Sequence, residues 1–230
     1  YGLAICYVDG KTLVYASQGA QDIISEYELS EGGTLKATGK KITDKRVKGS
    51  NLPLHFAGIA LNSECTTLYA VQNQPSPFTK MQGGLGIYDV ASGNLKLRIS
   101  TPGFPFGVVA ITKGAAKDKK IYVSSERDGV VGSYDPETGK SYRLIATGSQ
   151  PTMMYLSPDQ SRLFVANASS DTVSIIDTSN DRVLTTALLR PPALRGLPGV
   201  SPLGMCLTPN GKKLLVALSD MNCIAQVNPV

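Results

Sequence analysis

The residue types that most often perform catalysis or bind metals are few in this chain. Its single histidine is His55, and none of its four cysteines form a C-x-x-C pair. A zinc site with several imidazoles needs more than one histidine, and a Ser-His-Asp triad would depend on His55 without a G-x-S-x-G nucleophile elbow. We therefore predict no catalytic residues, no metal site and no cofactor in this chain.

The composition argues against several classes of protein. Hydrophobic residues make up 42% and charged residues 18% of the 230 residues, which is typical of a folded domain. The net charge of +5 comes from basic clusters at 36–48 and 113–120, which lack interleaved aromatic residues. We interpret both clusters as solvated loops and expect no nucleic-acid partner. No run approaches the roughly 18 apolar residues of a transmembrane segment.

A repeat of four strands accounts for the chain. Its anchors are apolar residues spaced by 55, 53, 42 and 51 residues, namely Leu13, Leu68, Ile121, Leu163 and Leu214. Each anchor opens a continuous apolar run, as expected of a strand that is buried on both faces between neighbouring sheets. Short strands of this kind bury their apolar surface by stacking as radial blades, so the sequence predicts a β-propeller.

The predicted fold class is all-β, a β-propeller of four-stranded antiparallel blades with almost no helix. We predict a single propeller domain over residues 1–230. Its blades are expected at about 2–43, 53–100, 103–147, 150–189 and 202–230, the last of which stops after its third strand.

Acidic residues recur where the third strand of a blade ends. Asp89, Asp135 and Asp177 occupy this position in three repeats, and a residue able to adopt positive φ follows four positions later. A side chain that accepts hydrogen bonds at the start of a tight turn explains this pattern. We therefore interpret these carboxylates as hairpin architecture and not as catalytic groups.

Polar residues that follow the second strands form the most site-like pattern in the sequence. They recur about once per blade, and loops at this end of a blade reach the mouth of a propeller's central channel. A hydrated loop face explains the same pattern, so both interpretations stay open. The candidate ligand-binding residues are Asn73, Glu126, Arg127, Asn167 and Ser219, together with His55, which lies just before the first strand of the second blade.

Two further segments have alternative interpretations. The loop 72–84 contains Phe78 and Met81, which could contact a partner or fold back on their own blade. Asn167 begins an Asn-Ala-Ser sequence that would accept a glycan in a eukaryotic secretory host.

The cysteines are predicted to be free thiols. Cys6 falls at a core position of the repeat, and Cys65 falls in a turn where we expect it to be exposed. Cys206 and Cys223 belong to the first and third strands of one blade, which lie roughly 9–10 Å apart, too far for a bridge. The sequence therefore predicts no disulfide.

Residues 156–167 and 171–178 resemble the YVTN repeat of YncE-like propellers, and the resemblance is strongest over residues 103–190. Residues 189–217 are similar to a late blade of bacterial proteins in which a propeller precedes an alkaline-phosphatase-like phosphoesterase domain. The family commonly has seven blades. The resemblance therefore implies that these five blades are part of a seven-bladed ring. Relatives with this repeat are often exported, so the resemblance also implies that the protein is periplasmic or extracellular.

We expect this chain to be a non-catalytic scaffold that binds a protein partner or a small ligand across its loop face. The alternative is the accessory propeller region of a phosphoesterase or lactonase-like hydrolase, with a phosphoesterase domain downstream in the parent chain.

Overall fold

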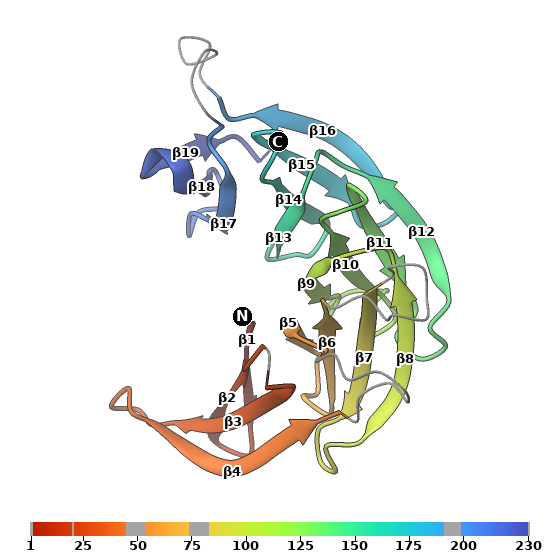
Figure 1. The fold of residues 1–230 in the computed structure, drawn as a ribbon. Coiled ribbons are helices and arrows are strands. Elements are labelled where there is room, and N and C mark those ends of the chain that lie inside the picture. The colour runs from red at the N-terminus through yellow and green to blue at the C-terminus, as the bar shows by residue number, and fades with distance from the viewer. Residues whose placement is uncertain (1, 20, 45–53, 74–82, 191–198, 230) are drawn as a thin grey trace.

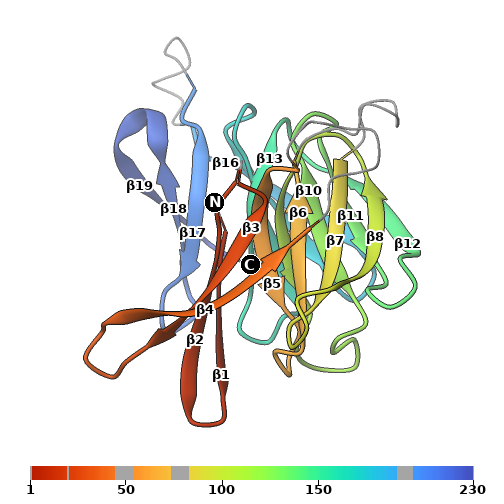
Figure 2. The ribbon, with the colours of Figure 1, turned by 60° about the horizontal axis from the view of Figure 1, so that its bottom comes forward.

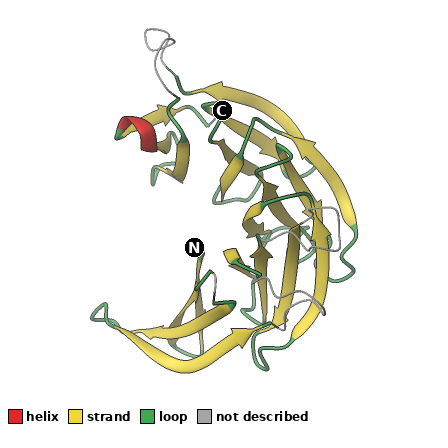
Figure 3. Cartoon of the chain, in the orientation of Figure 1, coloured by secondary structure: helices red, strands yellow, loops and turns green. Residues whose placement is uncertain are grey.

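The computed structural model describes residues 2–19, 21–44, 54–73, 83–190 and 199–229. These residues form nineteen strands and one 3₁₀ turn, η2 (Ser219–Met221). The strands dominate Figure 3, where the 3₁₀ turn is the one helical segment among the described residues. The prediction of an all-β chain with almost no helix is confirmed.

The strands form five antiparallel sheets in which neighbours in sequence are neighbours in space. Blade 1 contains β1 (Leu3–Val8), β2 (Lys11–Ser17), β3 (Ile23–Leu29) and β4 (Leu35–Thr43). Blade 2 contains β5 (Phe56–Leu61), β6 (Thr67–Gln72), β7 (Gly83–Asp89) and β8 (Leu95–Thr101). Blade 3 contains β9 (Pro105–Ala110), β10 (Ile121–Ser125), β11 (Val130–Tyr134) and β12 (Ser141–Ala146). Blade 4 contains β13 (Pro151–Leu156), β14 (Arg162–Asn167), β15 (Thr172–Asp177) and β16 (Arg182–Leu188). Blade 5 contains β17 (Pro202–Leu207), β18 (Leu214–Leu218) and β19 (Cys223–Val227).

The five blades stand side by side along an arc (Figure 1). The first strand of each blade lies on the concave side, and β4, β8, β12 and β16 form the outer rim. Figure 1 shows that the arc stays open between blade 1 and blade 5 in the described part of the chain, and Figure 2 shows the same strands turned by 60°. The radial arrangement confirms the predicted propeller.

Apolar side chains on both faces of the middle strands hold the blades together. We call the face of a blade toward the preceding blade its N-face and the opposite face its C-face. Along β6, Leu68 and Ala70 join a buried cluster with blade 1, whereas Tyr69 and Val71 join one with blade 3. Because successive residues of a strand point to opposite faces, one continuous apolar run serves two interfaces.

In the second strand of blade 1, the residues equivalent to those of the other blades lie one position later than the sequence spacing predicts. The Ser17 hydroxyl donates to the Ala57 carbonyl of blade 2 at 2.8 Å, as the Ser124 hydroxyl donates to the Thr152 carbonyl of blade 4 at 2.6 Å. Val14, three residues before Ser17, therefore corresponds to Ile121, and the placement of Leu13 there was wrong. Since Leu13 and Val14 are both apolar, the spacing of apolar residues could not distinguish them.

The inner strands of blades 1 to 4 approach each other so closely that one position favours glycine in blades 1, 2 and 3. A Cβ on Gly58 of β5 would lie 2.7 Å from the Phe106 carbonyl oxygen and 2.9 Å from the Gly107 Cα of β9. These atoms are backbone and cannot move without shifting a strand. Gly204 has the same position in β17, and a Cβ there meets nothing within 4 Å.

Gly58→Ala should therefore destabilise the protein far more than Gly204→Ala. We expect Gly58→Ala to cost about 1–3 kcal/mol, because a methyl group is forced against backbone. Gly204→Ala should change the melting temperature by less than about 2 °C. Thermal melting of the two variants beside the parent chain checks this pair, and equal losses would contradict the strand contact described above.

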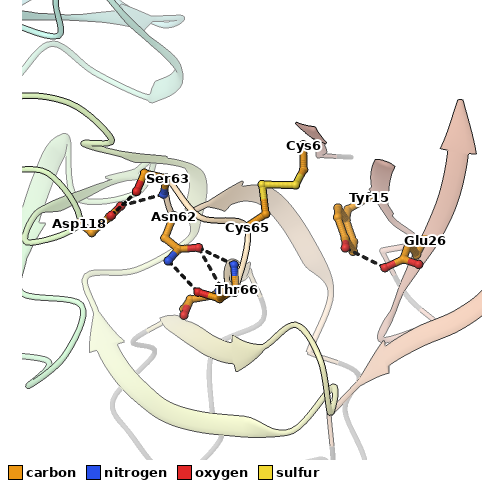
Figure 4. Close-up of a disulfide and its surroundings, with 9 residues drawn as sticks. Cys6, Tyr15, Glu26, Asn62, Ser63, Cys65, Thr66 and Asp118 are labelled. Carbon is orange, nitrogen blue, oxygen red and sulfur yellow. Dashed lines mark hydrogen bonds between the residues drawn. A yellow bond between two sulfur atoms is a disulfide. The ribbon is translucent and has the colours of Figure 1, made fainter. Parts of the chain in front are cut away.

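The structure contains a disulfide, so the prediction of four free thiols was wrong. Cys6 in β1 is bonded to Cys65 in the turn between β5 and β6, with a Cα–Cα distance of 6.1 Å (Figure 4). Cys65 is half-buried and not exposed as expected. The prediction compared cysteines within one blade, whereas this bond joins two blades. Cys206 and Cys223 are free and exposed.

The disulfide occupies a position that other blades use for hydrogen bonds to the preceding blade. In the first hairpin turn of blades 2, 3 and 4, the side chain of one residue with positive φ contacts the preceding blade. We call this residue the turn clasp. Cys65, Asp118 and Gln160 have φ values of 60°, 55° and 59°. Asp118 accepts a hydrogen bond from the Ser63 amide at 2.8 Å, and Gln160 accepts one from the Thr112 amide at 2.7 Å. Figure 4 shows the Asp118 clasp beside the disulfide.

Candidate functional site

The concave side of the arc is an apolar cavity of about 520 Å³. Strands β1, β5, β9 and β13 line it, with Leu3, Phe106, Met153 and Tyr155 among the side chains. Leu3 and Met153 are exposed, and Phe106 and Tyr155 are half-buried. The five inner strands contain no Asp, Glu, Lys, Arg or His at all. The wall of the central channel is therefore uncharged.

A ring of backbone hydrogen bonds shapes the mouth of this channel. The residue immediately before an inner strand has positive φ in four blades, and we call it the lead-in residue. The lead-in residues are His55, Phe104, Gln150 and Ser201, with φ between 45° and 53°. Each lead-in carbonyl accepts a hydrogen bond from the backbone amide of a residue just after the second strand, at 2.9–3.1 Å. The donors are Asn73, Glu126, Ala168 and Ser219.

Three of the predicted residues therefore share one structural position, and a fourth does not. Asn73, Glu126 and Ser219 occur at equivalent places around the mouth. Asn167 lies one residue earlier and is fully buried, where its amide donates to the hydroxyls of Thr172 and Ser174. Asn167 supports its own blade, and burial excludes a glycan at this residue in the folded protein.

The other two predicted residues have contacts within the mouth. His55 is the lead-in residue of blade 2, and its amide donates to the Asp22 carboxylate of blade 1 at 2.9 Å. Arg127 is exposed and forms an ion pair with Asp128 at 2.8 Å. That pair lowers the pKa of Asp128, whose other oxygen accepts the Gly103 amide at 2.7 Å. Both residues thus help to fix the loop backbone around the mouth.

Glu126 has a half-buried carboxyl group at the mouth of the channel. Burial raises the pKa of its carboxyl above the ordinary glutamate value. No side-chain hydrogen bond or ion pair compensates for this burial among the described residues. Asn73, by contrast, donates from its side chain to the Pro105 carbonyl at 3.2 Å. A half-buried carboxylate without a partner is available for a ligand that donates hydrogen bonds.

Glu126→Gln should stabilise the protein in a pH-dependent way. The folded state holds the Glu126 proton more tightly than the unfolded chain, whose glutamate pKa is about 4.3. Ionisation therefore opposes folding as the pH rises above that value. We expect the variant to melt above the parent at pH 7 and with it below about pH 4. Glu64→Gln, at an exposed turn residue, is the control, and a pH-independent difference would contradict the assignment.

The remaining predicted features have clear placements. Asp89, Asp135 and Asp177 accept backbone amides at 2.8 Å in their hairpin turns, as interpreted from the sequence. Hydrogen bonds from Ser92 lower the pKa of Asp89 to about 2.

Phe78 and Met81 lie outside the described residues. The described residues contain no group of three or more His, Cys, Asp and Glu side chains placed to hold a metal ion. They also contain no helix that is long and apolar enough to cross a membrane.

The sequence reasoning missed the wall of the channel. Phe106, Met153 and Tyr155 line the cavity, and none of them is among the residues predicted to bind a ligand. A signal was present, because the first strand of every repeat lacks charge while each outer strand carries at least one Lys or Arg. A strand that faces a channel filled with water can carry charged residues. The absence of charge in every first strand, in contrast to the outer strands, could therefore have identified an apolar cavity.

Two solved structures resemble this fold. Over 94% of this chain, the structure is similar to a chain of Kuenenia stuttgartiensis hydrazine synthase, with a TM-score of 0.68 and 14% identity. The present chain spans about half, 54%, of that chain. A functionally unknown protein from Desulfotomaculum acetoxidans DSM 771 matches over 98% of this chain and 68% of its own, with a TM-score of 0.70 and 13% identity. At these identities the likeness shows the fold alone.

The sequence comparisons give the family. No curated protein matches the chain. Residues 109–225 match the YNCE-like beta-propeller family, which confirms the resemblance carried by the repeats at 156–178. The match covers half of the chain and includes most of blade 3, all of blade 4 and the strands of blade 5 up to Ala225. This chain belongs to the YNCE-like β-propeller family.

Proposed function

We propose that this chain is a non-catalytic scaffold that binds a small ligand or a partner's apolar segment at the mouth of its channel. The observation that carries the proposal is an uncharged, apolar wall beneath a polar rim. Binding cavities for small molecules have this composition, with a few polar groups that fix the orientation of the ligand. The cavity of about 520 Å³ is of the size that such ligands fill.

The wall selects against charge in the body of the ligand. A charged group that enters the channel would lose hydration without an opposite charge in the inner strands to replace it. The ligand is therefore uncharged where it contacts Phe106 and Tyr155. Its polar end faces the rim, where Glu126 accepts hydrogen bonds. Met153 and Met154 line the same wall, and flexible thioether side chains adapt to ligands of different shape.

A neutral apolar dye tests this function. N-phenyl-1-naphthylamine should bind the chain with enhanced fluorescence, and Met153→Asp should weaken binding by at least about tenfold because it puts a charge on the wall. Leu188→Asp is the matched control, since Leu188 is 66% exposed on the outer strand β16. Unchanged binding by Met153→Asp, or an equal loss in Leu188→Asp, would contradict a site in the channel.

An assay for catalysis separates this function from the hydrolase alternative. Metal-dependent hydrolysis of a phosphate monoester or a lactone by the purified chain would contradict a non-catalytic scaffold. The same ligand titration with and without a divalent metal ion gives the second readout, because binding to an uncharged wall should not depend on metal.

The disulfide supports export to the periplasm or the extracellular space, because disulfides persist in oxidising compartments and the cytosol keeps thiols reduced. Blocking the thiols of intact cells with a maleimide before lysis tests this location. Two of the four cysteines, Cys206 and Cys223, should react in the unreduced chain, and all four should react after reduction. Four reactive thiols without reduction would contradict export.

A further inference from the structure

Tyr69 of blade 2 is a buried side chain whose hydroxyl has no hydrogen-bond partner among the described residues. It is 2% exposed and lies in the interface between blades 2 and 3. Burial, followed by the charge of Asp118, raises the pKa of Tyr69 to about 12, so the hydroxyl keeps its proton and can donate. Tyr69 also lines a pocket of about 320 Å³ at this interface. A hydrogen-bond acceptor bound in the pocket would provide the missing partner.

The tyrosines at the same position of the second strand in blades 1 and 3 both donate to a carboxylate. Tyr15 donates to Glu26 at 2.7 Å (Figure 4), and Tyr122 donates to Asp181 at 2.6 Å. Glu26 belongs to the same blade as its tyrosine, whereas Asp181 comes from the next blade. The fold therefore supplies a carboxylate to this hydroxyl in two different ways, and Tyr69 receives neither.

The pocket beside Tyr69 has the position that an ion pair fills between blades 3 and 4. There the Lys120 ammonium donates to the Asp181 carboxylate at 3.0 Å. Lys120 and Asp181 align with Thr67 and Gly139 at the interface of blades 2 and 3, so neither charged group has an equivalent there. An ammonium group in contact with a carboxylate is also what a free α-amino acid carries in one small molecule.

Charged groups of both signs line the pocket. The Lys96 ammonium of blade 2 lies 3.2 Å from the Asp89 carboxylate, and the Lys96 side chain is 47% exposed. Asp118 of blade 3 accepts the Ser63 amide at 2.8 Å, and Glu137 is exposed. A ligand with a single charge would meet a like charge on this wall. A zwitterion can turn each of its ends toward the opposite charge.

We propose that the pocket between blades 2 and 3 binds a free α-amino acid with an apolar side chain. The ligand's carboxylate accepts the Tyr69 hydroxyl and faces Lys96, and its ammonium faces Asp118. Its side chain contacts Ile87 and Leu97, which line the same pocket. No residue lines both this pocket and the channel, so the amino-acid site is separate from the channel site.

Calorimetric titration with L-leucine tests the site. Its two halves, 4-methylpentanoate and 3-methylbutylamine, each keep one charged group and should bind at least about tenfold more weakly. Tyr69→Phe should weaken L-leucine binding at least about tenfold, because the ligand's carboxylate loses its hydroxyl donor. Phe164 has the same position in blade 4, so the repeat accommodates phenylalanine there. Tyr27→Phe is the matched control, since it removes a half-buried hydroxyl from β3 of blade 1 and should leave binding unchanged.

Thr67→Lys gives a readout that general damage to the interface would not reproduce. The new ammonium takes the position that Lys120 has in blade 3, where it competes with the ligand's ammonium and attracts its carboxylate. The variant should therefore weaken L-leucine binding at least about fivefold and strengthen 4-methylpentanoate binding at least about threefold. Absence of L-leucine binding up to about 10 mM would overturn the proposal. Unchanged binding in Tyr69→Phe, or weaker binding of both ligands in Thr67→Lys, would overturn it as well.

Discussion

Replacing Cys6 and Cys65 together by serine should lower the free energy of unfolding by about 2–4 kcal/mol. The disulfide closes a loop of 59 residues, and its loss returns conformational entropy to the unfolded chain. It also removes the covalent link between the inner strand of blade 1 and the first turn of blade 2. Blade 1 lies at one end of the arc and has only one neighbour in the described part of the chain, so we expect it to loosen before blades 2, 3 and 4. Denaturant unfolding followed by hydrogen exchange measures both effects.

Replacing Cys206 and Cys223 by serine is the matched control. Both thiols are exposed and neither forms a disulfide, so this double variant should unfold within about 0.5 kcal/mol of the parent. A reducing agent should reproduce the Cys6/Cys65 result in the parent and have no effect on the variant that lacks the bond. Equal stability of the oxidised parent and the Cys6/Cys65 variant would show that the bond does not hold blade 1.

Asp181→Ala should cost about 3–5 kcal/mol. Asp181 belongs to the hairpin between β15 and β16 of blade 4 and is 5% exposed. It accepts hydrogen bonds from Tyr122 at 2.6 Å, Lys120 at 3.0 Å and Ser133 at 2.8 Å, all in blade 3. Removing the carboxylate leaves a largely buried ammonium without its counter-charge.

A double-mutant cycle separates this network from general damage. Lys120→Met removes the ammonium and keeps the apolar stem, so Lys120→Met combined with Asp181→Ala should be more stable than the sum of the single losses predicts. Glu137→Ala, at an exposed position of blade 3, should have little effect. Strictly additive losses at residues 120 and 181 would mean that the two side chains do not act as a pair.

The blade repeat could be predicted because its signals are local. Runs such as Leu163–Ala166 encode a strand buried on both faces, and Asp177 with Asp181 encodes the hairpin that follows. The prediction for the lysine-rich loop was correct for Lys113, Lys117 and Lys119, which are exposed. Lys120 differs, because it pairs with an acid 61 residues away, and nothing near it in the sequence marks that partner.

The interpretation of the basic cluster at 36–48 as a loop was wrong for residues 36–43, which lie in the outer strand β4. The other errors concern contacts between blades. The spacing of apolar residues placed Leu13 at the position that Val14 occupies. Cys65 was predicted to be an exposed turn residue without a contact to another blade. Comparing the turn clasps would have corrected the error at Cys65, because Asp118 and Gln160 also contact the preceding blade from that position. Asn167 was placed at the mouth by a one-residue shift, and in a strand such a shift moves a side chain to the opposite face.

The methionine methyl groups offer the most direct test of a binding site in the channel. The chain has five methionines, so a methyl-labelled sample gives five signals in an NMR spectrum. Met153 and Met154 line the cavity, whereas Met221 packs in the cluster between blades 4 and 5. Titration with a neutral apolar ligand should shift the methyl signals of Met153 and Met154 and leave that of Met221 unchanged. Unmoved signals from Met153 and Met154, beside a shift at Met221, would contradict a ligand site in the channel.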